Sequence, residues 1–300
     1  MTESAFESVA LGGIYPPIPT PFGEDGEVAH RALAENLGRW GQYDLRGYVV
    51  LGSNGEAVYL SEQEKLDVLK TAREAIPKDK LFIAGTGCES ARQTIALTQE
   101  AARIGADAAL VLSPHFFKMS SENLVSYYCA VADASPLPVV LYNVPKFTHF
   151  EMDAATIARA AEHPNVVGIK DSGGNITKIA DVVRRTGQGF QVLAGSAGFL
   201  FASLTLGAVG GVLALANVAP QQAIDIYTLF RAGEWDRAAE LQRQMIPVNA
   251  AITARFGVPG LKAALDMLGW YGGPVRLPLL GLGEADQQVL RGILVIGGVL

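Results

Sequence analysis

The sequence predicts a (β/α)8 barrel, also called a TIM barrel, followed by a C-terminal helical extension. Eight short apolar runs recur between residues 13 and 232, and a helical pattern separates each run from the next. The runs are continuous rather than alternating, which is typical of parallel strands that are buried on both faces. Eight such units favour a closed barrel over an open doubly wound sheet, because parallel strands need covered faces and right-handed crossovers.

An open dinucleotide-binding sheet is the main alternative. That fold carries the fingerprint G-x-G-x-x-G after its first strand, where the backbone approaches a pyrophosphate. The nearest match in this chain is "GTGCES" at 85–90, which lacks the third glycine. The sequence therefore favours the barrel.

The eight predicted strands are rich in Val, Ile and Leu. They span residues 13–20, 47–52, 81–86, 108–113, 139–144, 166–171, 190–195 and 210–215.

The intervening helices have recognisable beginnings. Ser61 with Glu64, and Ser90 with Gln93, fit the capping box, in which side chains satisfy two free backbone N–H groups reciprocally. Apolar residues at helical spacing then follow. They are Leu66, Leu69, Ala72 and Ile76 in one helix, Leu124, Tyr128 and Val131 in another, and Ile176, Ile179 and Val183 in a third.

After residue 232 the pattern is helical only, apart from the Gly/Pro-rich segment "GWYGGPVRLPLLGLG". We therefore expect three parts: an N-terminal tail (1–12), the barrel (13–232) and a C-terminal helical region (233–300).

Composition excludes several classes of protein. The net charge is -6 and no basic cluster occurs, which argues against a nucleic-acid binder. The two cysteines and four histidines match no metal-ligand spacing, so we expect no metal and no other cofactor. The apolar stretches are too short for a membrane span, and the N-terminus lacks the pattern of a signal peptide. We expect a soluble cytoplasmic protein.

The candidate functional residues lie where the predicted strands end. Active sites of such barrels are built from the C-terminal ends of the strands and the loops that follow. In chain order these positions are Thr20, Gly52–Glu56, Thr86, Ser113, Tyr142 with Asn143, Lys170 with Asp171 and Ser172, and Gly195 with Ser196.

Lys170 is the one lysine or arginine among these positions. Partial burial of an amine disfavours its charged form, which leaves a nucleophile that can attack a ketone and form a Schiff base. The structural alternative is a lysine that extends to solvent or pairs with Asp171.

Tyr142 ends the strand before that of Lys170, so the two side chains are predicted neighbours. A phenol there can relay the protons that imine chemistry moves, although a core tyrosine with one hydrogen bond is an equal alternative. The segment "GSNGE" can present backbone N–H groups to an anion, and it lacks the Gly-Lys-Ser/Thr of a P-loop. A carboxylate suits it better than a triphosphate, but an ordinary glycine turn is as reasonable.

Five motifs in order resemble the dihydrodipicolinate synthase / N-acetylneuraminate lyase family: "GIYPPIPTPF", "GSNGE", "LYNVP", "GIKDSGG" and "VLAGSAGF". The resemblance runs from about residue 13 to 280 and implies a barrel with a helical extension, usually tetrameric. It implies that Lys170 forms a Schiff base with pyruvate or another 2-keto acid and that Tyr142 shuttles protons. Ser53 and Asn54 would hold the carboxylate of the keto acid, and Thr20, Gly195 and Ser196 would complete the substrate site.

Within the family, the tract from "HPNVVGIKDSGG" through "FQVLAGSAGFLFASLTLGAVGGVLALANV" to "NAAITARFGVPGLK" looks most like 4-hydroxy-2-oxoglutarate aldolase. We therefore expect a lyase that cleaves 4-hydroxy-2-oxoglutarate to pyruvate and glyoxylate. The synthase has an arginine two residues after the proline of "YNVP", and this chain has Phe147. Where the family often supplies a tyrosine from a neighbouring subunit, this chain reads "SPHFFK", with His115, Phe116 and Phe117.

Two other functions stay open. The same imine would serve a synthase that condenses pyruvate with an aldehyde, or an aldolase or dehydratase of a 2-keto-3-deoxy sugar acid. A keto-acid binder that has lost turnover is the non-enzymatic alternative.

Overall fold

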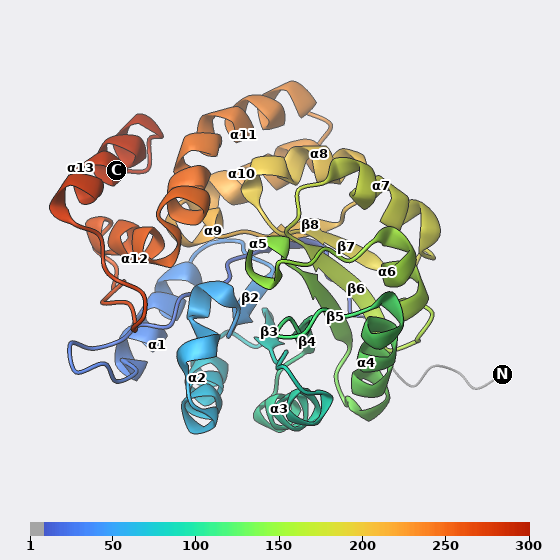
Figure 1. Cartoon of the computed structure of the whole chain (residues 1–300). Helices are drawn as coiled ribbons and strands as arrows, with labels where there is room; N and C mark the ends of the chain where they lie inside the picture. Colours follow the sequence, from blue (N-terminus) through green and yellow to red (C-terminus); the bar gives the residue numbers. More distant parts are fainter. Residues whose placement is uncertain (1–8) are drawn as a thin grey trace.

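All eight predicted strands form, and they pair in parallel in the order β1-β8-β7-β6-β5-β4-β3-β2. The ring closes between β1 and β2 through a short parallel bridge in which Pro17 pairs with Val49. The computed structural model, which describes residues 9–300, is therefore a (β/α)8 barrel, as the sequence predicts (Figure 1). Residues 1–8 of the predicted tail lie outside the described residues.

The strands are β1 (Gly13–Tyr15), β2 (Gly47–Val50), β3 (Leu81–Gly85), β4 (Ala108–Leu112), β5 (Val139–Asn143), β6 (Val166–Asp171), β7 (Gln191–Ala194) and β8 (Gly210–Val212). Several are shorter than predicted. β1 stops at Tyr15 because Pro16 and Pro17 follow, and proline has no N–H for the ladder. β8 stops at Val212 because a helical turn begins at Leu215.

The helices around the barrel are α1 (His30–Trp40), α2 (Glu62–Ala75), α3 (Ala91–Ile104), α4 (Ser121–Ala134), α6 (Ala154–Ala160), α7 (Ile176–Arg185), α8 (Leu200–Thr205) and α10 (Pro220–Arg231). The short helices α5 (Pro145–Thr148) and α9 (Leu215–Val218) follow β5 and β8 directly. Within residues 9–300, no helix combines the length and the apolar character that crossing a membrane requires.

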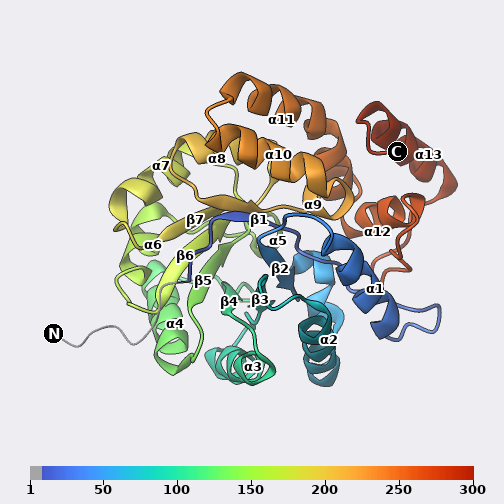
Figure 2. The same ribbon diagram turned by 180° about the vertical axis from the view of Figure 1, so that it is seen from behind.

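The C-terminal helices are α11 (Trp235–Ala250), α12 (Gly257–Met267) and α13 (Glu284–Ile296), and a π-helical turn (Ala251–Arg255) joins the first two. Figures 1 and 2 both show this group gathered on one side of the barrel, with α11 beside α10 and α12 near α9.

Two apolar cores stabilise the fold. One fills the barrel interior with residues that include Tyr15, Val49, Leu110, Val140 and Leu193. The other lies between the outer faces of the strands and the helices. Burial of this apolar area is the main driving force for folding.

Helix α2 begins as predicted. The Ser61 hydroxyl accepts a hydrogen bond from the Glu64 N–H, and the Glu64 carboxylate accepts one from the Ser61 N–H. The box predicted for α3 is only half formed: Ser90 accepts from the Gln93 N–H, but the Gln93 side-chain oxygen meets the Ser90 hydroxyl and not its N–H. A further capping box, Ser120 with Asn123, starts α4 and was missed because Asn stands where Glu or Gln is expected.

Glu64 also binds the C-terminal extension. Its carboxylate accepts hydrogen bonds of 2.5 and 3.1 Å from the guanidinium of Arg276. The hydrogen bond from Arg276 is the main reason that the pKa of Glu64 falls from 4.5 to about 2. A carboxylate with a lowered folded-state pKa stabilises the protein above pH 4.5 and loses that contribution as the pH falls towards 2.

We therefore expect Glu64→Gln to destabilise the protein by up to about 1 kcal/mol at pH 7, the range for loss of a partly exposed ion pair, because glutamine can still complete the capping box. Urea unfolding measured between pH 7 and pH 3 checks this: the gap between wild type and variant should narrow below pH 4.5. A gap that stays constant over this range would contradict the assignment.

Candidate functional site

A cavity of about 1200 Å³ opens at the C-terminal ends of the strands. The loops after β2, β3, β4 and β5 line it on the barrel side, and the C-terminal extension lines the opposite side. Ser53, Tyr142 and Phe147 contribute from the barrel, and Arg255 and Phe256 contribute from the extension. Figure 1 shows α5, which carries Phe147, lying across the centre of the ring of strands.

Lys170 points into the barrel. On β6 it is paired with Tyr142 of β5 and with Leu193 of β7, and both of these residues belong to the interior core. Residues directly opposite on paired strands face the same side of a sheet, so all three side chains are directed inward. The Lys170 Nζ lies 4.1 Å from the centre of the Tyr142 ring, and the side chains are 3% and 5% exposed.

The structure excludes a pairing of Lys170 with Asp171. Successive side chains on a strand point to opposite faces, and Asp171 points outward. There its carboxylate accepts hydrogen bonds from the Asn143 amide at 3.0 Å and the Gly173 N–H at 2.9 Å. The Lys178 Nζ lies 2.7 Å from the Asp171 carboxylate and forms an ion pair with it.

Three lysines are buried among the described residues: Lys170, Lys178 and Lys262. Lys178 forms ion pairs with Asp171 and Glu151, and Lys262 forms one with Glu56. Within residues 9–300, Lys170 alone of these three has no carboxylate within ion-pair distance. A buried ammonium without a partner is unfavourable, so this position suits an amine that reacts rather than one that pairs.

The hydroxyl of Tyr142 lies 3.2 Å from the Ser53 hydroxyl. Ser53 belongs to a short 3₁₀ turn (Ser53–Gly55) that follows β2. The fold thus brings Lys170 and Tyr142 together, as the sequence predicts for adjacent strands of a barrel, and Ser53 joins them from the turn after β2. The arrangement offers an amine and two hydroxyls to one small carbonyl compound.

Asn54 and Thr20 have different surroundings. The Asn54 amide nitrogen is buried and has no hydrogen-bond partner among the described residues. Such a donor is costly unless a ligand satisfies it. The hydroxyl of Thr20 instead donates to the Gly55 carbonyl at 2.7 Å, so it holds the turn that carries Ser53 and Asn54.

Gly195 and Ser196 follow β7. The Gly195 N–H donates to the Asp171 carbonyl at 2.7 Å, and a Cβ at this position would lie 2.0 Å from the Ser172 hydroxyl oxygen. Only glycine fits this close approach. The Ser196 hydroxyl accepts hydrogen bonds from the Gly198 N–H and from the amide of Asn249 in α11, so it links this loop to the C-terminal extension.

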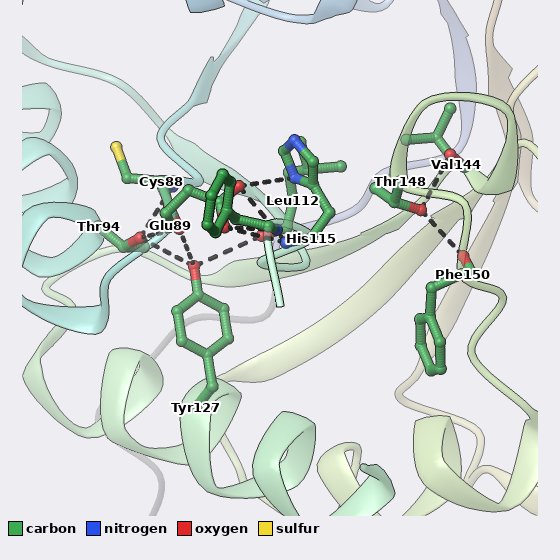
Figure 3. A network of polar contacts seen from close by, with 10 residues as sticks. Cys88, Glu89, Thr94, Leu112, His115, Tyr127, Val144, Thr148 and Phe150 are labelled. Atoms are coloured by element: carbon green, nitrogen blue, oxygen red, sulfur yellow. Dashed lines mark hydrogen bonds and ion pairs between the residues drawn. The ribbon is translucent and has the colours of Figure 1, made fainter. Parts of the chain in front are cut away.

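A polar network that sequence reasoning missed lies on the α3–α4 side of the cavity (Figure 3). The Glu89 carboxylate lies 2.8 Å from the His115 Nδ1 and accepts hydrogen bonds from the N–H groups of His115 and Phe116. Nearby, the Tyr127 hydroxyl contacts the Thr94 hydroxyl at 2.8 Å and the Cys88 and Leu112 carbonyls, and burial raises its pKa. The histidine was visible in "SPHFFK", but Glu89 gave no signal because the contact joins two separate loops.

The same figure shows how the loop after β5 is held. The Thr148 hydroxyl donates to the carbonyls of Val144 and Phe150, which closes the turn around α5. Phe147 in this turn is 48% exposed and lines the cavity, where the synthase pattern has an arginine.

No group of three or more His, Cys, Asp or Glu side chains within residues 9–300 is arranged to hold a metal ion.

Comparison with known proteins identifies the family. The model of the dihydrodipicolinate synthetase family matches residues 10–296. A 4-hydroxy-tetrahydrodipicolinate synthase of Methanothrix thermoacetophila is 34% identical over 283 residues, covering 94% of this chain and 95% of that protein. The corresponding protein of Methanoculleus marisnigri is 35% identical and covers 95% and 99% of the two chains.

Solved structures agree with this result. The dihydrodipicolinate synthase of Acinetobacter baumannii complexed with pyruvate superposes with a TM-score of 0.93 at 31% identity, covering 97% of this chain and 100% of that one. The Thermotoga maritima synthase gives a TM-score of 0.92 at 30% identity, covering 96% and 99%.

These relatives correct one prediction. They are named synthases, so the expectation that this chain is a 4-hydroxy-2-oxoglutarate aldolase is wrong. The misleading signal came from one tract in the second half of the chain, which weighs less than a match over nearly the whole chain. The chain belongs to the dihydrodipicolinate synthetase family.

Proposed function

We propose that this protein condenses pyruvate with an aldehyde through a Schiff base on Lys170, the type of reaction its synthase relatives are named for. One observation carries the proposal: Lys170 is buried in the barrel, has no carboxylate partner among the described residues, and lies 4.1 Å from the ring of Tyr142. Aldolases of the family use the same intermediate to cleave a carbon–carbon bond. We propose condensation rather than cleavage because the relatives of this chain are named synthases.

In the proposed reaction the Lys170 Nζ attacks C2 of pyruvate and forms a carbinolamine. Loss of water gives the imine, which acts as an electron sink. The carboxylate of pyruvate would accept a hydrogen bond from the Asn54 amide, a buried donor with no partner among residues 9–300, and would lie beside Ser53.

Loss of a proton from C3 then converts the imine to an enamine, and C3 attacks the aldehyde carbon. The new alkoxide takes a proton, and water hydrolyses the resulting imine to release the product and free the amine. Tyr142 is placed to carry these protons, since its hydroxyl lies 3.2 Å from that of Ser53 and its side chain lines the cavity.

The aldehyde would enter from the cavity beside Phe147. In the synthases an arginine at this position binds the second carboxylate of the aldehyde, and an apolar ring cannot do so. We propose that the aldehyde carries less charge at its distal end. A sugar-derived 2-keto-3-deoxy acid is then an alternative product or substrate.

We further propose a homotetramer, as the family resemblance implies. Phe116 and Phe117 support an interface, because they are 79% and 69% exposed side by side on the loop after β4. Large exposed aromatic side chains are typical of protein contacts. The cytoplasmic location stays a prediction.

Reduction with borohydride in the presence of pyruvate should attach pyruvate irreversibly to wild type and not to Lys170→Met, because only an imine is reduced to a stable amine. Intact-protein mass spectrometry measures the adduct. Lys65→Met is the matched control: Lys65 lines the cavity, and its replacement should leave adduct formation intact. An adduct on Lys170→Met would overturn the assignment.

Tyr142→Phe should still form the adduct but lower kcat by about 10²- to 10⁴-fold, the usual contribution of a positioned proton donor. Steady-state kinetics with pyruvate and an aldehyde panel checks this. A kcat within a few-fold of wild type would remove Tyr142 from the mechanism, and an adduct in wild type without turnover of any aldehyde would favour the non-enzymatic binder.

Phe147→Arg should shift preference towards aldehydes with a distal carboxylate by about 10- to 100-fold in kcat/KM, the value of a hydrogen bond to a charged group. Phe147→Leu controls for loss of the ring. The proposal on substrate charge fails if wild type already prefers the carboxylate-bearing aldehyde.

A further inference from the structure

Glu56 directly follows the Ser53–Gly55 turn and adopts an unusual backbone conformation. Its φ is 53° and its ψ is 30°, the left-handed region that favours glycine. The residue as a whole is only 2% exposed, although glutamate is rarely buried. A buried glutamate in a strained position calls for a specific interaction to hold it there.

That interaction comes from the C-terminal extension. The Nζ of Lys262, in α12, lies 2.6 Å from Glu56 Oε1, and both side chains are 1% exposed. The other carboxylate oxygen of Glu56 accepts a hydrogen bond of 2.9 Å from the Arg276 N–H. Glu56 is therefore bound from two separate segments of the extension.

The Lys262 ammonium has two favourable contacts besides Glu56. It donates to the Pro274 carbonyl at 2.8 Å and lies 4.3 Å from the centre of the Phe22 ring. Burial lowers its pKa, and the Glu56 carboxylate opposes that shift. A Cβ at Gly272 would lie 2.0 Å from the Lys262 carbonyl oxygen, so the chain after α12 packs directly against this helix.

Hydrogen bonds and an ion pair thus hold the Ser53–Gly55 turn and the residues after it from two sides. On the barrel side the Thr20 hydroxyl binds the Gly55 carbonyl. On the outer side Glu56 is fixed by Lys262, and the Tyr59 carbonyl accepts a hydrogen bond of 2.9 Å from the Arg276 guanidinium. Ser53 and Asn54 directly precede these held residues in the chain.

Stability alone does not account for a buried ion pair. Replacing such a pair by apolar residues of similar size is often neutral or stabilising, because two charges must be taken out of water. What an ion pair supplies is a fixed geometry between the two segments. The geometry here belongs to the turn that carries the Ser53 hydroxyl, which contacts Tyr142, and the Asn54 amide, which has no partner in the described part of the chain.

We propose that the Glu56–Lys262 ion pair positions the Ser53–Asn54 turn for the carboxylate of the keto acid, which makes the C-terminal extension part of the substrate site. This inference rests on the proposed function in one respect, the role of the turn in binding pyruvate. Glu56 and Lys262 are positioning residues, and neither is assigned contact with the substrate.

The test is borohydride trapping at a series of pyruvate concentrations. Lys262→Met should raise the concentration for half-maximal trapping by about 10- to 100-fold, since displacement of about 1 Å in a site costs up to 10²-fold. The maximal yield of adduct should stay close to that of wild type, because Lys170 is untouched. Glu56→Gln should have the same effect, and the double variant should be no worse than either single one.

Leu265→Ala is the control for a general loss of stability. Leu265 is fully buried in the same helix and contributes to the apolar core. This variant should lower Tm at least as much as Lys262→Met but leave the half-maximal pyruvate concentration unchanged. The inference is overturned if Lys262→Met traps pyruvate as wild type does, or if Leu265→Ala weakens trapping equally.

Hydrogen exchange without pyruvate separates this inference from the proposed function. In Lys262→Met the amides of residues 53–60 should exchange faster than in wild type, while those of α4 should not change. Unchanged exchange in 53–60 overturns the inference whatever the protein catalyses, whereas failure of wild type to trap pyruvate overturns only the proposed function.

Discussion

The site depends on one electrostatic constraint: Lys170 is buried, and no carboxylate of residues 9–300 lies within ion-pair distance of it. Lys170 shares the barrel interior with apolar side chains and with Tyr142, and its sequence neighbour Asp171 is directed to the other face of β6. There Asp171 forms an ion pair with Lys178 and accepts a hydrogen bond from the Asn143 amide. The pleat of a single strand thus directs the lysine proposed to form the imine and the carboxylate next to it in the sequence to opposite faces of β6.

The rest of the fold supplies rigidity around this amine. Backbone segments approach so closely after β6 and β7 that Gly195 has no space for a side chain. The turn after β2 is held from inside the barrel by Thr20 and from outside by the Glu56–Lys262 pair. A site built from such supports needs little rearrangement when a substrate binds, which favours catalysis by fixed geometry.

Local patterns in the sequence predicted the barrel and the neighbourhood of Lys170 and Tyr142, because strand order and strand ends follow directly from eight apolar runs. They did not predict the Glu56–Lys262 pair, because its partners lie far apart in the chain and neither position has a distinctive local pattern. The contact of Glu89 with His115 was missed for the same reason. The choice of enzyme was wrong because motifs shared by a whole family determine the imine chemistry but not the second substrate.

The most direct test of the central claim is a crystal structure of the protein soaked with pyruvate. The account predicts continuous density from the Lys170 Nζ to C2 of pyruvate, with the carboxylate within hydrogen-bond distance of the Asn54 amide. Pyruvate bound elsewhere, or bound in the barrel without a covalent link to Lys170, would contradict it.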